Sequence, residues 1–134
     1  MKINLFLIFY SLFIISFPVL AQANSDPLSK CYKTTAHKNR TETESCLYDE
    51  LKLSEQQLNV IYGKSKSDLE DIDFDETKTA IDALTVAQEY FVKFRTAECQ
   101  RQSTLLIGGA IAKDIFIACE IKLNQWRAKS LLNN

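Results

Sequence analysis

All four cysteines of this chain lie beyond an apolar N-terminal run that has the form of a secretory leader. Lys2 gives the run a positive start, residues 5–20 are almost wholly apolar, and Ala21-Gln22-Ala23 supplies a small–x–small cleavage site. The run is about 16 residues long, against the ~20 needed to span a bilayer. We therefore expect a cleaved signal peptide over residues 1–23. Because exported thiols tend to oxidise, two disulfides should constrain the fold.

Removal of the leader leaves residues 24–134, enough for one domain with a modest core. The 134-residue sequence has only three glycines and two prolines, and none of its segments alternates polar and apolar residues as a strand does. The formal net charge is −1 at pH 7, and no basic stripe is present, which argues against nucleic acid as a partner. The composition predicts an all-α domain.

Three stretches have apolar residues at helical spacing, and a polar segment over residues 24–40 precedes them as an irregular region or short helix. The predicted helices cover residues 41–69, 75–103 and 110–131. Thr41 or Thr43 can cap the first helix and Asp75 the second, whereas two consecutive glycines break the pattern before the third. The short connections favour antiparallel neighbours, so we expect a small antiparallel three-helix bundle.

Aromatic and polar residues also follow the helical faces. Because of their spacing, we expect the larger aromatic residues to lie in the core: Tyr62, Phe91, Phe94 and Trp126. On the last helix, four residues lie close to one line: Ile115, Cys119, Trp126 and Ser130. Four polar residues stand within or beside apolar stripes: Asn59, Gln88, Arg95 and Arg127. They form either a recognition patch or an interhelical hydrogen-bond network; we favour the network, with Arg95 paired to Glu98 or Glu44.

These positions carry a resemblance to a known family. The second helix reads AxxxLxxAQxxFxxxRxxEC from Ala80 to Cys99, and the last helix carries cysteine, leucine, arginine and leucine at four-residue steps. With the paired cysteines and the two glycines, the chain resembles the LprI-type lysozyme inhibitor family over nearly all of residues 24–134. Phe91 stands where the family usually has tryptophan, and Ala110 replaces a serine after the glycines. We expect the matching motif residues to be structural: Leu58, Asn59, Tyr62, Gln88, Phe91, Arg95, Glu98 and Arg127.

The resemblance implies a periplasmic or secreted protein, similar to ones that bind and inhibit lysozyme, with neither catalysis nor a cofactor. The alternative is a structural or stress-related envelope protein with an unknown partner. The residues themselves give little support for an enzymatic function. The single histidine, His37, has no ligand or base at helical spacing, and no CxxC or HxxxH pattern indicates a metal site.

Two pairings of the cysteines remain open. An antiparallel hairpin around the two glycines could join Cys99 to Cys119 and leave Cys31 to pair with Cys46. The competing pairing joins Cys46 to Cys99 and Cys31 to Cys119. We favour the local pairs, each of which would close a loop worth roughly 3 kcal/mol in the chain-entropy model.

Two segments are candidate partner surfaces. One is an acidic turn between the first and second helices, with Asp68, Glu70, Asp71, Asp73, Asp75 and Glu76. Since lysozymes are commonly basic, this turn could steer their association; otherwise it is a solvated turn. The other is the apolar link of Leu105, Leu106 and Ile107, which either contacts a partner or closes the end of the bundle.

Overall fold

The computed structural model describes residues 26–35, 39–72, 76–106 and 108–133, so the predicted leader lies outside the described part. The described residues form helices and no strand. The helices are α1 (Pro27–Thr35), α2 (Arg40–Glu70), α3 (Thr77–Thr104) and α4 (Ala110–Leu132). The all-α prediction is confirmed. The three long helices lie close to their predicted ranges, and α1 adds a fourth helix within the leading segment.

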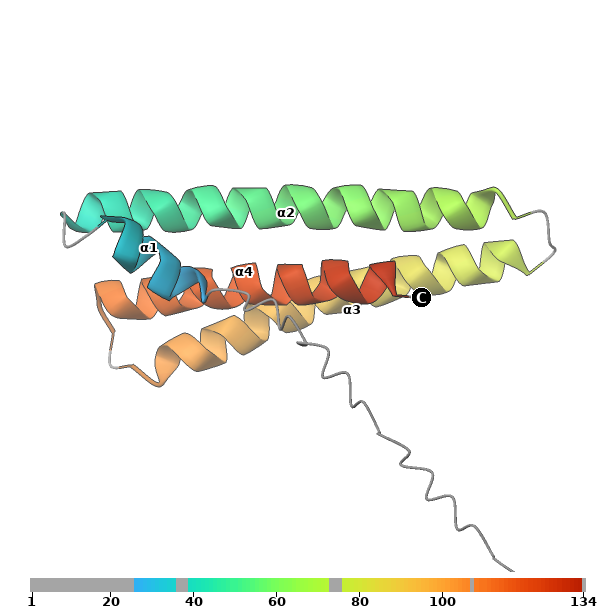
Figure 1. Cartoon of the computed structure of the whole chain (residues 1–134). Helices are drawn as coiled ribbons and strands as arrows, with labels where there is room; N and C mark the ends of the chain where they lie inside the picture. Colours follow the sequence, from blue (N-terminus) through green and yellow to red (C-terminus); the bar gives the residue numbers. More distant parts are fainter. Residues whose placement is uncertain (1–25, 36–38, 73–75, 107, 134) are drawn as a thin grey trace, which may run out of the picture.

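The long helices reverse direction at each connection. α2 runs the length of the bundle, α3 returns beside it, and α4 runs back in the direction of α2 (Figure 1). The short α1 contacts both α2 and α4 near one end. α2 has 31 residues and α4 has 23, which at about 1.5 Å per residue gives lengths of roughly 46 and 35 Å. The end of α2 and the start of α3 therefore extend beyond the end of α4 (Figure 1).

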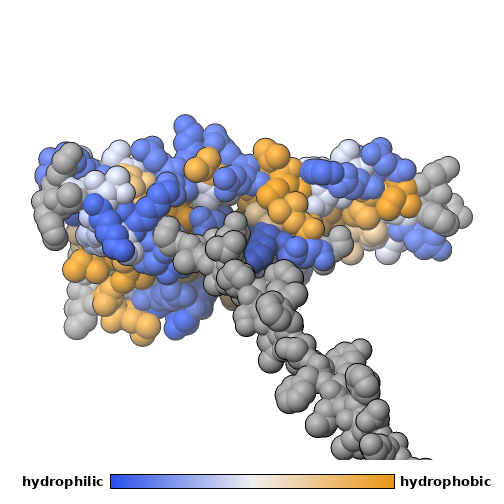
Figure 2. Space-filling model, in the orientation of Figure 1, coloured by the Kyte–Doolittle hydropathy of each residue, from blue (hydrophilic) through white to orange (hydrophobic). Residues whose placement is uncertain are grey.

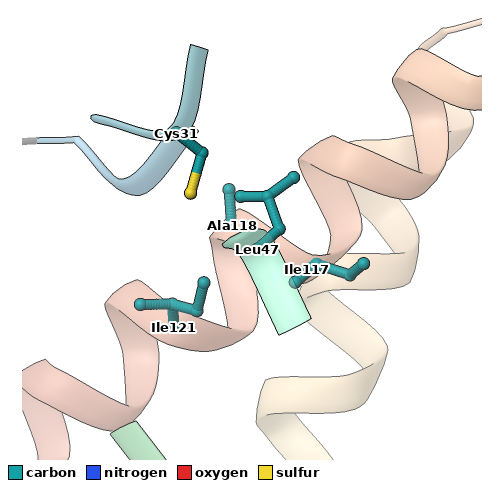
Figure 3. Close-up of a cluster of buried hydrophobic side chains, with 5 residues drawn as sticks. All are labelled: Cys31, Leu47, Ile117, Ala118 and Ile121. Carbon is teal, nitrogen blue, oxygen red and sulfur yellow. The ribbon is translucent and has the colours of Figure 1, made fainter. Parts of the chain in front are cut away.

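One hydrophobic cluster lies where α1 meets α2 and α4. Figure 3 shows its five buried residues: Cys31, Leu47, Ile117, Ala118 and Ile121. Leu47 and Ile121 have no exposed surface, and full burial of such a side chain stabilises the fold by about 1.5–3 kcal/mol. This cluster holds the short helix against the bundle through one face of α1, on which Pro27, Cys31 and Thr35 are buried at four-residue steps.

A second cluster joins the three long helices near the C-terminal end of α4. Its buried members are Leu58 from α2, Phe91 from α3, and Ala128 and Leu131 from α4. Among the described residues, α2 has no buried residue after Leu58 and α3 has none before Phe91. The buried core therefore stops where α4 stops. We call residues 59–72 and 76–90 the distal hairpin, and the other described residues the proximal half.

Both disulfides lie in the proximal half. Cys31 of α1 is bonded to Cys46 of α2, and Cys99 of α3 is bonded to Cys119 of α4. The structure thus has the local pairs and not the competing arrangement. Each bridge ties together two helices that follow one another in the chain, across the helix connections at residues 36–39 and 105–109.

The helix ends differ in part from the prediction. The N-cap of α2 is Asn39, whose side-chain Oδ1 accepts a hydrogen bond from the backbone N–H of Glu42 at 3.1 Å. Neither Thr41 nor Thr43 is a cap, because both lie inside α2. The Thr43 hydroxyl is buried against that of Thr35 of α1 at 3.0 Å. α3 begins after Glu76, which makes no side-chain cap hydrogen bond, and Asp75 lies outside the described residues.

The prediction that the large aromatic residues fill the core is wrong for two of them. Phe91 is only 6% exposed, whereas Phe94 is 53% exposed and Trp126 is 58% exposed. On α4 the buried line is offset from the predicted one and faces α2. Its members are Asp114, Ile117, Ile121, Asn124, Ala128 and Leu131. The predicted line lies on the side of α4 that faces α3, where Cys119 forms its disulfide. This side is partly exposed to solvent.

Candidate functional site

The two candidate partner surfaces lie at opposite ends of the bundle. The acidic segment is at the turn between α2 and α3, and the apolar segment is at the link between α3 and α4 (Figure 1). The 28 residues of α3 separate them, a distance of about 42 Å along the helix axis. They are therefore two separate surfaces.

The acidic surface is formed at the ends of α2 and α3. Its described carboxylates are all exposed: Asp68, Glu70, Asp71 and Glu76. Asp73 and Asp75 lie outside the described residues. Asp68 pairs with Lys64 one helical turn earlier at 2.7 Å, an exposed contact worth about 0.3–0.5 kcal/mol. Across the turn, the Thr77 hydroxyl donates to the carbonyl of Ile72 at 2.7 Å, which ties the start of α3 to the end of α2.

Beside this acidic surface is an apolar hollow of about 330 Å³. Its lining residues come from α2, α3 and the end of α4: Ser65, Asp68, Leu69, Ile72, Leu84 and Leu131. Only Leu131 is buried, and Ile72 is 46% exposed. The hollow exists because α2 and α3 continue past α4, so their facing apolar side chains lack the third helix that covers them elsewhere.

The apolar link does not close the end of the bundle. Leu105 is 74% exposed and Leu106 is 36% exposed, while Ile107 lies outside the described residues. On the face shown in Figure 2, apolar side chains gather beside this link and over the distal part of the α2–α3 hairpin, with hydrophilic surface between. Both ends of the molecule therefore present apolar surface, but only the distal end surrounds it with carboxylates.

Arg95 lies at the centre of a polar cluster that joins the three long helices. Its Nη1 donates to Asn124 Oδ1 at 2.6 Å, and Asn124 Nδ2 donates to Ser54 Oγ at 3.1 Å. Arg95 Nε is 3.3 Å from Glu120 Oε1, close enough for an ion pair but without the alignment of a hydrogen bond. Glu55 lies 3.8 Å from the same guanidinium. This cluster fixes the register of α2, α3 and α4.

Burial raises the pKa of Glu120, and the nearby Arg95 opposes that rise while Glu55 adds to it. The partners predicted for Arg95 are wrong. Glu98 instead binds Arg101 of its own helix at 2.6 Å, and Glu44 pairs with Lys113 of α4. Sequence spacing could suggest a partner within one helix, but it could not show which residues of the other helices face Arg95.

A second buried polar group, Asp114 of α4, was missed in the sequence. Asp114 has no exposed surface. It accepts a hydrogen bond from the Tyr32 hydroxyl at 3.0 Å and forms a two-point contact with the Arg40 guanidinium, whose Nη2 is 2.6 Å from Oδ1. The same Nη2 donates to the carbonyl of Ala110 at 2.8 Å. Asp114 could have been noticed in the sequence because it is the one carboxylate within the largely apolar start of α4.

Comparison with known protein families matches residues 31–131 to the model of lysozyme inhibitor LprI. The chain belongs to the LprI family. The match begins at the first disulfide cysteine and ends at Leu131, the last buried residue of α4. No curated protein and no solved structure matches the chain.

In this LprI chain, several family-motif residues make contacts between helices. Phe91, at the motif's aromatic position, is buried with its ring centre 6.3 Å from that of Trp126. Arg127 donates from Nε to Gln88 Oε1 at 3.1 Å, and its guanidinium carbon lies 5.7 Å from the Phe91 ring centre. Asn59 differs, because it is exposed and lines a shallow hollow beside Arg95.

This LprI domain has no free thiol. All four cysteines are in disulfides, and His37 lies outside the described residues. In the described ranges, no three histidine, cysteine or acidic side chains gather closely enough to hold a metal ion. Nor does any helix in this part of the chain have the length and hydrophobicity to cross a membrane.

Proposed function

We propose that this chain is an exported, non-catalytic inhibitor of lysozyme. The observation that carries the proposal is the family match over residues 31–131, from the first disulfide to the end of the core. Two disulfides suit an oxidising compartment. The leader over residues 1–23 would direct the chain there, leaving residues 24–134 as the working domain.

The mechanism in this proposal is occlusion by a folded helical surface. The two disulfides hold the proximal half together, so that half loses little conformational freedom on binding. Residues that touch lysozyme would exclude its substrate without any bond being formed or broken. The polar cluster around Arg95 and the buried Asp114 would support that surface by holding the helices in place.

An inhibition assay tests this function. Purified protein is added to lysozyme, and the lysis of a cell-wall suspension is followed by turbidity. We expect lysis to slow at near-stoichiometric ratios for at least one lysozyme among the chicken, goose and invertebrate types. Full activity of all three types in the presence of excess folded protein would refute the proposal.

A further inference from the structure

The distal hairpin has an apolar face that the fold itself does not cover. None of its described residues is buried. Its inward-facing apolar residues are half-buried at best: Ile61, Tyr62, Leu69, Ile81 and Leu84. Two helices bury only the narrow seam between them, so a wider apolar face stays exposed unless a further layer packs against it. In the proximal half α4 supplies that layer, and α4 ends at Leu132.

The hollow in this uncovered face has the size and lining of a site for apolar side chains. Its volume is about 330 Å³, and four of its six lining residues are leucine or isoleucine. Ile72 lies just past the end of α2, whereas Leu84 packs against the second cluster and Leu131 belongs to it. An apolar side chain from a partner would extend the buried core into the hairpin.

The net charge of the residues around this hollow indicates which kind of partner would bind there. Residues 64–82 contain seven carboxylates and three lysines, a net charge of −4. The rest of residues 24–134 contains twelve basic and ten acidic residues, a net charge of +2. A negative patch at one end of an otherwise positive molecule attracts cations to that end and repels anionic partners. The surface therefore combines an apolar hollow with selection for a cationic protein.

We propose that lysozyme docks on the distal hairpin, with an apolar side chain in the hollow and its basic residues around the acidic rim; this inference rests on the proposed function above. The rim raises the rate of association, and the hollow slows dissociation. The exposed link at Leu105 is the weaker docking candidate, because residues 99–112 contain no carboxylate that could attract a basic partner.

A matched pair of substitutions tests the hollow. Ile72→Asp places a carboxylate in it, and Leu105→Asp makes the same chemical change at the opposite end. Both residues are exposed, so both variants should keep the parent's circular dichroism spectrum and melting temperature. For a lysozyme that the parent inhibits, we expect Ile72→Asp to weaken Kd by about tenfold or more. We expect Leu105→Asp to leave Kd within about twofold of the parent.

A second pair tests the acidic rim. Asp71→Lys and Asp49→Lys change the net charge equally, but Asp49 is exposed on α2 in the proximal half. Stopped-flow association with the same lysozyme should slow several-fold more for Asp71→Lys at low salt. The difference should shrink as salt screens the charges.

The outcomes separate the two proposals. If the parent binds none of the three lysozyme types, the proposed function fails and the docking site fails with it. If the parent inhibits a lysozyme but Ile72→Asp and Leu105→Asp bind it equally well, only the docking site is overturned. Equal association rates for Asp71→Lys and Asp49→Lys at low salt would overturn the steering role of the rim.

Discussion

Arg95 shows how a single polar residue can hold three helices in register. Its guanidinium faces Glu120 and Asn124 of α4 and Glu55 of α2, and its side chain is only 14% exposed. Removing one member of such a buried pair costs more free energy than the intact pair contributes. Removing one partner leaves the other charge without compensation in a low-dielectric site.

We expect Arg95→Ala to lower the free energy of unfolding by about 3 kcal/mol. Arg101→Ala is the matched control, because Arg101 lies on the same helix but its side chain is 60% exposed in its pair with Glu98. That exposed pair should contribute much less to stability than the buried one. Urea denaturation of both variants measures the difference. Equal decreases in the free energy of unfolding for the two variants would contradict the structural role of Arg95. If Arg95→Ala is as stable as the parent but no longer binds lysozyme, Arg95 belongs to the recognition surface instead.

The Glu98 carboxylate provides a test by pH. Hydrogen bonds from Arg101 and then Gln102 lower the pKa of Glu98 to about 2. Because the folded-state pKa lies below the unfolded value, this contribution to stability is present above about pH 4.3 and is lost as the pH falls toward 2. An NMR titration should find a Glu98 pKa near 2, and Arg101→Ala should raise it toward the ordinary glutamate value. An unchanged pKa in that variant would show that Arg101 is not the cause.

Sequence reasoning succeeded less well for residues than for helices. The spacing of Phe94 and Trp126 fits a helical face, but both side chains are exposed. Whether an edge residue is covered depends on how far the neighbouring helix is rotated, and one sequence does not contain that rotation. Asn124 was missed for the same reason, because its fully buried position follows from packing on α2 and α3.

At the scale of the helices, the sequence was a better guide. Apolar spacing and the two glycines placed the bounds of α2, α3 and α4 within a few residues. The predicted cap of α2, Thr41 or Thr43, was wrong because α2 begins at Arg40 with Asn39 as its cap, so both threonines lie inside the helix. Thr43 packs instead against Thr35 of α1, a helix that the sequence left as one of two alternatives. A cap depends on local geometry, so a competing tertiary contact can displace it.

Gly63 and Gly109 form a matched pair for testing the backbone conformations of the helices and their connections. A Cβ added at Gly63 or at Gly109 would meet no atom within 4 Å, so steric contact does not distinguish them. Gly63 lies inside α2, and Gly63→Ala should stabilise the protein by about 0.5–1 kcal/mol. Gly109 precedes α4 with φ 89° and ψ −173°, so Gly109→Ala should cost about 1–3 kcal/mol. Thermal unfolding measures both, and equal shifts would contradict the backbone assignment at Gly109.

The described residues divide into a proximal half that contains both disulfides and a distal hairpin without buried residues. Both disulfides and both buried clusters lie in the proximal half or at its boundary. The distal hairpin contains no buried residue among those described. Segments with few buried apolar contacts open locally at low free-energy cost, so this hairpin should open more readily than the rest of the molecule.

This division was not predicted from the sequence, although the predicted range 110–131 is shorter than the ranges 41–69 and 75–103. The apolar stripe of α2 continues through Leu69 and that of α3 begins at Ile81, so both suggest a core along the full bundle. The helix lengths decide otherwise, since α4 is too short to cover the far ends of α2 and α3. Predicting an uncovered face requires the relative positions of all three helices.

Hydrogen exchange followed by mass spectrometry, with and without an inhibited lysozyme, tests the account most directly. For the protein alone, we predict faster exchange in residues 61–72 and 77–88 than in the α4 core. Bound lysozyme should slow exchange in those two segments and leave the link at residues 104–111 unchanged. Protection confined to that link, or to the proximal helices, would contradict the assignment of the distal hairpin as the surface that engages lysozyme.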